Sequence, residues 1–170
     1  MALSKGAGHP MPAECTFVLN RSRLSTLTCP GFGSVPAFSG NGRYINDPGS
    51  TAVADKGPLP AGVYYIIDRQ SGGHLGWFRD TVMDAALNTY RAEWFALYRI
   101  DGQIDDWTIV NGIRRGHFRL HPVGRLGESD GCITLTSRGQ FDKLRAFLKA
   151  QPTTQVPGTS FRAYGKVTVK

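Results

Sequence analysis

The chain has 170 residues, 41% of them hydrophobic and 19% charged, and it contains 21 glycines and 10 prolines. This length is typical of a single domain, and the many turn-forming residues favour short strands over a helical bundle. The formal net charge is +7, but the longest run of basic residues is Arg114-Arg115 and no nucleic-acid-binding motif is present, so we expect no nucleic acid partner.

The N-terminal segment MALSKGAGHPMPAEC lacks the apolar core that marks a cleaved secretion signal. No apolar stretch reaches the roughly 18 residues that predict a membrane-spanning helix. We therefore expect a protein that is made in the cytoplasm without a cleaved signal and has no membrane span. Residues 1–14 are predicted to be a flexible leader, and residues 15–170 a single domain.

The segments TFVLN and LSTLT alternate apolar and polar residues, which is typical of two strands that form a hairpin turning near residues 21–23. If the turn is centred on Ser22, Cys15 lies opposite Cys29. A disulfide between them would stabilise the fold by about 3 kcal/mol in the chain-entropy model. Two reduced, partly buried thiols are the alternative.

A long segment rich in Gly, Pro, Asn and Asp, residues 32–60, predicts a loop region with room for one short strand. It is followed by GVYYIIDR (62–69), whose β-branched and aromatic residues between turn formers predict the strongest strand of the chain. The pattern over 81–99 is mixed. We expect a helical turn over 85–90 and then a strand from WFALYR.

The segment WTIVNGIRRGHFRLH carries an Asn-Gly hairpin signal, and its end, HFRLH, predicts a further strand. Ser137 can cap a helix over about 138–150. The apolar stripe of that helix consists of Phe141, Leu144 and Leu148. Residues 160–169 predict a final strand pair or edge strand. The sequence therefore predicts a mainly β fold, a β-rich α+β domain with one clear C-terminal helix.

One stretch, FRLHPVGRLGESDGCITL, carries the strongest chemical signal. A thiol attacks as its thiolate, and a nearby imidazole can take its proton. Strand alternation places His117, Arg119 and His121 on one face, and the Gly- and Pro-containing link can return the chain so that Cys132 lies beside His121. The pattern predicts a nucleophile and its general base.

The residues around Cys132 fit this chemistry. Gly131 permits close approach of a substrate, and the amides of Gly131 and Cys132 can point at a developing oxyanion. Ser129 either holds the turn through side chain-to-backbone hydrogen bonds or is an ordinary turn serine. Arg119 either pairs with a substrate carboxylate or is a solvated strand charge.

Three alternatives compete for Cys132. The first is a buried, inert cysteine. The second is a zinc site with His117 and His121, but two side chains four positions apart on a strand lie ~13 Å from each other, too far for one ion. The third is a papain-like or cell-wall endopeptidase pair, and the order of His before Cys in this chain argues against it.

The segment Ser129-Asp130-Gly131-Cys132-Ile133, preceded by His121, resembles the active-site signature of YkuD-type L,D-transpeptidases. LPAGVYYIID is similar to the start of that family's central strand. Asp130 stands where the signature has a second histidine, and the gap after His121 is shorter than usual. Both departures match a narrower group, the Tlde1-type effectors of type VI secretion.

Four segments carry this narrower resemblance in the same order, over roughly residues 15–165: FSGNG, GPLPAGVYYIIDRQSGGHLG, GHFRLHP and SDGCITL. The resemblance implies a YkuD-like β-sandwich or barrel and a cysteine enzyme with no cofactor and no metal. Such an enzyme cuts the peptidoglycan peptide stem between meso-diaminopimelate and D-alanine. It acts as an L,D-carboxypeptidase with water, or as an L,D-transpeptidase that exchanges a D-amino acid.

The resemblance also implies roles for single residues. Cys132 is the nucleophile, His121 the general base, and the backbone carbonyl of Pro122 orients His121. Asp130 is expected to turn its side chain away, because a carboxylate would repel an oxyanion. The residues expected to line the substrate groove are Ser39, Tyr44 and Lys56.

The implied partners are the peptidoglycan stem, a cognate immunity protein and the type VI secretion machinery, and the implied place of action is the periplasm of target bacteria. Two other functions stay open from the sequence. One is a peptidoglycan-binding module with a vestigial site, and the other is a Cys/His cell-wall endopeptidase.

Overall fold

The computed structural model describes residues 11–69, 91–124 and 129–170. The predicted helical turn over 85–90 and most of the predicted leader lie outside these residues. The strands in chain order are β1 (Ala13–Phe17), β2 (Ser25–Cys29), β3 (Gly33–Phe38), β4 (Gly62–Asp68), β5 (Phe95–Arg99), β6 (Trp107–Val110), β7 (Ile113–Gly116), β8 (Arg119–Pro122), β9 (Ile133–Leu135), β10 (Thr154–Gln155) and β11 (Arg162–Val169). The helix α2 spans Arg138–Lys149, and short 3-10 turns occupy Gly42–Tyr44, Pro48–Ser50 and Arg91–Glu93.

In the described part of the chain, nine strands form one sheet in the order β1-β2-β3-β9-β8-β5-β4-β11-β10. The sheet closes into a barrel because β11 pairs with β1 in parallel as well as with β4 in antiparallel orientation. β10 pairs with the first residues of β11, beyond the closed part. The predicted mainly β fold with one C-terminal helix is confirmed. Residues 160–169 were predicted to form a final strand pair or edge strand; they contain one final strand, β11, and it is not at an edge, since it pairs on both sides.

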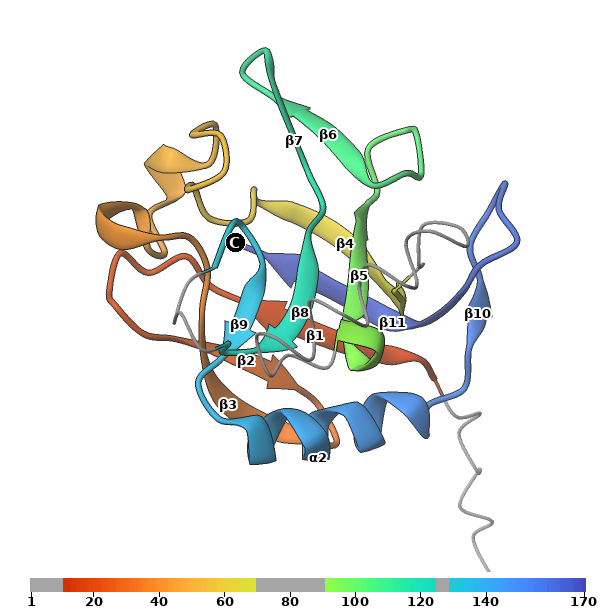
Figure 1. The fold of residues 1–170 in the computed structure, drawn as a ribbon. Coiled ribbons are helices and arrows are strands. Elements are labelled where there is room, and N and C mark those ends of the chain that lie inside the picture. Colours follow the sequence, from red (N-terminus) through yellow and green to blue (C-terminus); the bar gives the residue numbers. More distant parts are fainter. Residues whose placement is uncertain (1–10, 70–90, 125–128) are drawn as a thin grey trace, which may run out of the picture.

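The barrel interior is filled by the inward residues of its strands. They include Phe17, Leu27, Tyr64, Ile66, Phe95, Leu97, Leu120, Ile133, Leu135 and Val167. Helix α2 lies below the barrel in Figure 1, and Ser137 caps it by accepting a hydrogen bond from the Gln140 amide. Its buried stripe of Phe141, Leu144 and Leu148 joins the same core, as predicted.

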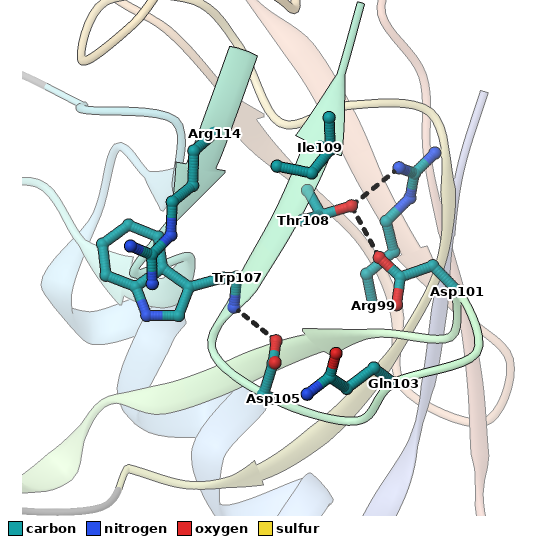
Figure 2. Close-up of a pocket in the computed structure, with 8 residues that line it drawn as sticks. All are labelled: Arg99, Asp101, Gln103, Asp105, Trp107, Thr108, Ile109 and Arg114. Carbon is teal, nitrogen blue, oxygen red and sulfur yellow. Dashed lines mark hydrogen bonds between the residues drawn. The ribbon is translucent and has the colours of Figure 1, made fainter. Parts of the chain in front are cut away.

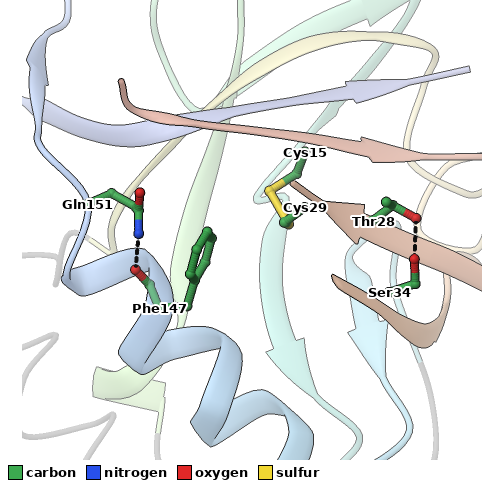
Figure 3. The surroundings of a disulfide bond; sticks show 6 residues. All are labelled: Cys15, Thr28, Cys29, Ser34, Phe147 and Gln151. Carbon is green, nitrogen blue, oxygen red and sulfur yellow. Dashed lines mark hydrogen bonds between the residues drawn. A yellow bond between two sulfur atoms is a disulfide. The ribbon is translucent and has the colours of Figure 1, made fainter. Parts of the chain in front are cut away.

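The hairpin of β1 and β2 carries a disulfide between Cys15 and Cys29 (Figure 3). The register pairs Thr16 with Thr28, so the two cysteines lie directly opposite one another. Both are buried in the barrel core, at 3% and 1% exposure. The cross-link therefore joins neighbouring strands at the point where β1 also pairs with β11.

A second hairpin, β6–β7, projects beyond the barrel at the top of Figure 1. Asn111 and Gly112 join its strands, both with positive φ (49° and 78°), as expected for the Asn-Gly turn that the sequence predicts. The predicted continuous strand HFRLH is wrong. His117 adopts φ of 57° and separates β7 from β8, so the chain changes direction before it enters the barrel.

Candidate active site

The parallel pair β8 and β9 brings the predicted nucleophile and base together. Leu120 pairs with Ile133 and His121 with Thr134. Leu120 and Ile133 point into the core, so His121 and Thr134 lie on the opposite face. Cys132 comes directly before the first residue of β9. Cys132 and His121 line one pocket of about 510 Å³.

The imidazole of His121 is held on two sides. Its Nδ1 lies 2.7 Å from the carbonyl oxygen of Pro122, and the ring stacks on the indole of Trp94 at 4.2 Å and 20°. A carbonyl only accepts hydrogen bonds, so Nδ1 carries the proton, and Nε2 of the neutral ring is an acceptor for the Thr134 hydroxyl. Thr134 Oγ1 lies 3.4 Å from that Nε2.

The electrostatic setting keeps His121 neutral. The side chain is 6% exposed. Burial lowers the pKa of His121 to about 4, although the Pro122 carbonyl favours the charged ring, and the nearby charge of Arg119 lowers it further. At neutral pH the ring is therefore neutral, and burial makes it a weaker base than an exposed imidazole.

Cys132 is the free cysteine among the described residues and is buried, with 7% exposure. Its Sγ lies 3.9 Å from the carbonyl oxygen of His117. Burial raises the pKa of the Cys132 thiol to about 11, against the backbone N–H and the charge of Arg119, which favour the thiolate. The resting pair is therefore a thiol and a neutral imidazole.

The turn before Cys132 has tight packing requirements. Gly131 has φ of 83°, and a Cβ there would lie 2.4 Å from Nη2 of Arg115. The buried hydroxyl of Ser129 donates to the carbonyl oxygen of Cys132 at 2.9 Å. Ser129 therefore holds the turn, and glycine is required at position 131.

Arg115 is buried beneath this turn, with 3% exposure. Its guanidinium donates to the carbonyl oxygens of Gly57 (2.9 Å), Pro58 (3.1 Å) and Thr51. These carbonyls belong to the Gly- and Pro-rich loop region. Arg115 thereby ties that loop region to the turn that carries Cys132.

Arg119 lines the same pocket, but its guanidinium is engaged with Asp106. Nη1 lies 2.6 Å from Oδ1 and Nη2 lies 2.7 Å from Oδ2, a bidentate ion pair. The ring of His117 contacts the same carboxylate through Nδ1 at 3.0 Å. Asp106 therefore fixes the short segment between β7 and β8 that lies against Cys132.

The pocket wall combines both signs of charge. Its lining residues are Asp55, Arg69, Arg91, Trp94, Gly116, His117, Arg119, His121, Asp130 and Cys132. Asp130 is exposed and lines the pocket, whereas we expected it to turn away, and its charge raises the pKa of Cys132. Among the described residues, no group of three or more His, Cys, Asp or Glu side chains could hold a metal ion.

The three residues expected to line the groove do not line this pocket. Ser39 is fully buried, and its hydroxyl accepts a hydrogen bond from the Leu59 amide at 2.7 Å. Tyr44 accepts a hydrogen bond from the neighbouring Arg43. Lys56 is exposed, and its backbone carbonyl accepts a hydrogen bond from the Asn41 amide. Asp55, beside Lys56, is the residue of this loop that reaches the pocket.

Sequence reasoning missed Trp94, Thr134, Asp106 and Arg115. Thr134 could have been found, because it lies two positions after Cys132 in the segment SDGCITL. The others come from distant segments, and no spacing rule links them to the Cys132 motif. Trp94 lies directly after the 3-10 turn Arg91–Glu93, at the start of β5.

A second pocket, of about 480 Å³, lies at the base of the β6–β7 hairpin (Figure 2). Thr108 links two opposite charges there, accepting from Arg99 at 3.0 Å and donating to Asp101 at 2.6 Å. The guanidinium of Arg114 covers the face of Trp107 at 3.8 Å. The polar and charged groups of this pocket therefore bind one another. The pocket contains neither Cys132 nor His121.

The family model of the Tlde1 domain matches residues 33–159. This range includes β3 to β10, helix α2 and the whole of the pocket described above. No curated protein and no solved structure matches the chain. In the described residues no helix is long and apolar enough to cross a membrane.

Proposed function

The chain belongs to the Tlde1 domain family, which indicates a type VI secretion effector, and on this premise we propose that it is a cysteine L,D-carboxypeptidase and L,D-transpeptidase. The proposed substrate is the peptidoglycan peptide stem, cut between meso-diaminopimelate and D-alanine. One observation carries the proposal: Cys132, directly before β9, and His121, on the neighbouring strand β8, line one pocket.

The first half of the reaction forms an acyl-enzyme. His121 Nε2 takes the proton from Cys132 Sγ, and the sulfur attacks the carbonyl carbon of the diaminopimelate–D-alanine amide. The carbonyl oxygen becomes an oxyanion. When the C–N bond breaks, the imidazolium returns the proton to the leaving nitrogen, D-alanine departs, and a thioester links the stem to Cys132.

The second half releases the stem. His121 takes a proton from water, whose oxygen attacks the thioester carbonyl, and the C–S bond breaks to give a shortened stem and the free thiol. If the amine of a D-amino acid attacks instead, the product is an exchanged stem. Both acceptors need the same base, so one site supports both reactions.

The surroundings of the pair support this chemistry. The Pro122 carbonyl fixes the tautomer of His121, so that Nε2 is the accepting nitrogen. The positive φ of Gly131 turns the chain just before Cys132, where the amides of Gly131 and Cys132 are proposed to donate to the oxyanion. Because the resting thiol is neutral, the thiolate forms during attack.

Muropeptide mass analysis tests the proposal. Purified protein is incubated with disaccharide-tetrapeptides, with and without an added D-amino acid such as D-methionine. We expect loss of the terminal D-alanine without the added amino acid and its replacement when the amino acid is present. Binding to sacculi without any change of muropeptide mass would identify a binding module instead. Cleavage between other stem residues would identify an endopeptidase.

The pH dependence of kcat/KM for D-alanine release should report the unusual state of His121. The base must be neutral, and burial lowers its pKa to about 4 from the ordinary 6.5. We therefore expect kcat/KM to stay near its maximum as the pH falls to about 5.5 and to decline only as His121 becomes protonated. A half-maximal point near pH 6.5 would contradict the buried, neutral base.

The remaining proposals concern the setting of the reaction. We propose that the protein acts in the periplasm of target bacteria, after export by the type VI secretion machinery, and that a cognate immunity protein protects the producing cell. The relationship to YkuD-type L,D-transpeptidases stays a prediction.

A further inference from the structure

The strongest contact that the proposed reaction does not yet use is the stack of Trp94 on His121. The two rings are 4.2 Å apart and nearly parallel, at 20°. The backbone around Trp94 is anchored on both sides, since its N–H donates to the Arg91 carbonyl at 3.1 Å and its carbonyl accepts from the Arg69 amide at 3.4 Å. The indole is therefore held in place against the imidazole.

The indole N–H does not explain this placement. Trp94 Nε1 is buried and has no hydrogen-bond partner in the part of the chain that the structure describes. Buried tryptophan N–H groups usually find a partner. The face of the ring, and not its polar edge, thus makes the specific contact at this site.

A ring stacked on an imidazole has two physical effects. It limits rotation about χ2, which keeps Nε2 beside Thr134, at 3.4 Å from Oγ1, in the wall of the pocket that Cys132 also lines. Its π-face also attracts a cation, and the attraction is strongest for tryptophan in a desolvated place. When His121 takes the thiol proton it becomes such a cation, so the stack favours the state that contains the reactive thiolate.

We propose that Trp94 is a positioning residue that orients His121 and stabilises its imidazolium form, and thereby promotes thiolate formation at Cys132. The inference rests on the proposed roles of His121 and Cys132. Other charged groups also line the pocket around this pair. The acidic groups, which favour the imidazolium, are Asp55 and Asp130, and the basic groups, which disfavour it, are Arg69, Arg91, Arg119 and a protonated His117. None of these residues is substituted in the test, although the guanidinium of Arg91 lies over the Trp94 ring at 5.9 Å and loses that contact in Trp94→Leu.

The test compares Trp94→Phe with Trp94→Leu in the intact protein. Both variants remove the indole N–H and keep an apolar side chain over the imidazole, but only phenylalanine keeps a π-face. The readout is alkylation of Cys132 by iodoacetamide, followed by mass spectrometry from pH 5 to pH 9. Cys15 and Cys29 are joined in the disulfide, so Cys132 is the free thiol of the three cysteines.

In this probe reaction the sulfur forms a bond to the methylene carbon, iodide leaves, and the thiol proton passes to His121. We expect Trp94→Leu to react roughly tenfold more slowly than Trp94→Phe at pH 7, as the loss of a desolvated cation–π contact implies. In a His121→Ala background the two variants should react at equal rates. Equal rates with His121 present, or the same gap without it, would overturn the proposal.

A measurement on the unaltered protein covers the case that a variant fails to fold. In NMR spectra, the ring protons of His121 should show cross-relaxation to those of Trp94, and the absence of this contact would overturn the proposal. The alkylation assay needs no peptidoglycan. Equal rates of the two variants, with muropeptide turnover intact, would therefore reject the role of Trp94 and leave the proposed function standing.

Discussion

Replacement of Cys132 by alanine is expected to reduce D-alanine release from tetrapeptide muropeptides by about 10⁴-fold or more, because no acyl-enzyme can form. His121→Ala should produce a loss of similar size, because when two residues act as one catalytic unit, removal of either one abolishes most of the rate enhancement of both. The double variant should then be hardly slower than either single variant. Initial rates from muropeptide mass analysis measure all three.

His117→Gln provides the matched control for the base. His117 lines the same pocket, but its ring contacts Asp106, and its carbonyl, which lies 3.9 Å from Cys132 Sγ, survives the substitution. We expect a loss of no more than about tenfold. Undiminished turnover by Cys132→Ala would end the assignment of the nucleophile. A larger loss in His117→Gln than in His121→Ala would reassign the base. Circular dichroism checks that each variant is folded.

The parts of the fold that sequence could predict are those with local causes. The Asn111-Gly112 turn, the Ser137 cap and the stripe on α2 depend on residues within one or two turns of each other, and the structure confirms them. Closure of the barrel depends on the parallel pairing of β1 with β11, from opposite ends of the chain. No local pattern encodes that pairing.

The pocket shows the same division. The sequence predicts that Cys132 and His121 lie close together, and the two residues line one pocket next to the paired strands β8 and β9. The predicted groove residues Ser39, Tyr44 and Lys56 lie in a turn-rich loop region, and such loops often bind ligands. Ser39 instead satisfies a buried backbone amide, a role that sequence alone does not distinguish from ligand binding.

Arg119 pairs with a carboxylate of the chain itself. The sequence offered it as a partner for a substrate carboxylate, and it does line the pocket. Its bidentate pair with Asp106 uses the geometry that a substrate carboxylate would need. Asp106 comes from the segment before β6, so the ion pair braces the backbone of β8 next to Cys132 and His121.

Replacement of Arg115 by methionine is expected to lower the free energy of unfolding by about 3 kcal/mol, because the buried carbonyls of Gly57 and Pro58 and the partly buried carbonyl of Thr51 lose a charged donor at once. For a chain of this size the loss corresponds to a fall of roughly 6–12 °C in Tm. Arg115→Lys keeps the charge but cannot reproduce the planar fork, so its loss should be intermediate. Thermal unfolding by circular dichroism measures both.

The neighbouring residue supplies the control for Arg115. Arg114 is exposed and covers Trp107 in the second pocket, so Arg114→Met should change the free energy of unfolding by less than about 1 kcal/mol. Equal destabilisation by the two substitutions would contradict the role of Arg115.

The guanidinium of Arg115 packs against Gly131. Arg115→Lys should therefore also lower kcat by a larger factor than it changes KM, at temperatures where the variant is fully folded. Loosening the turn displaces the nucleophile and the proposed oxyanion donors, which act mainly in the transition state.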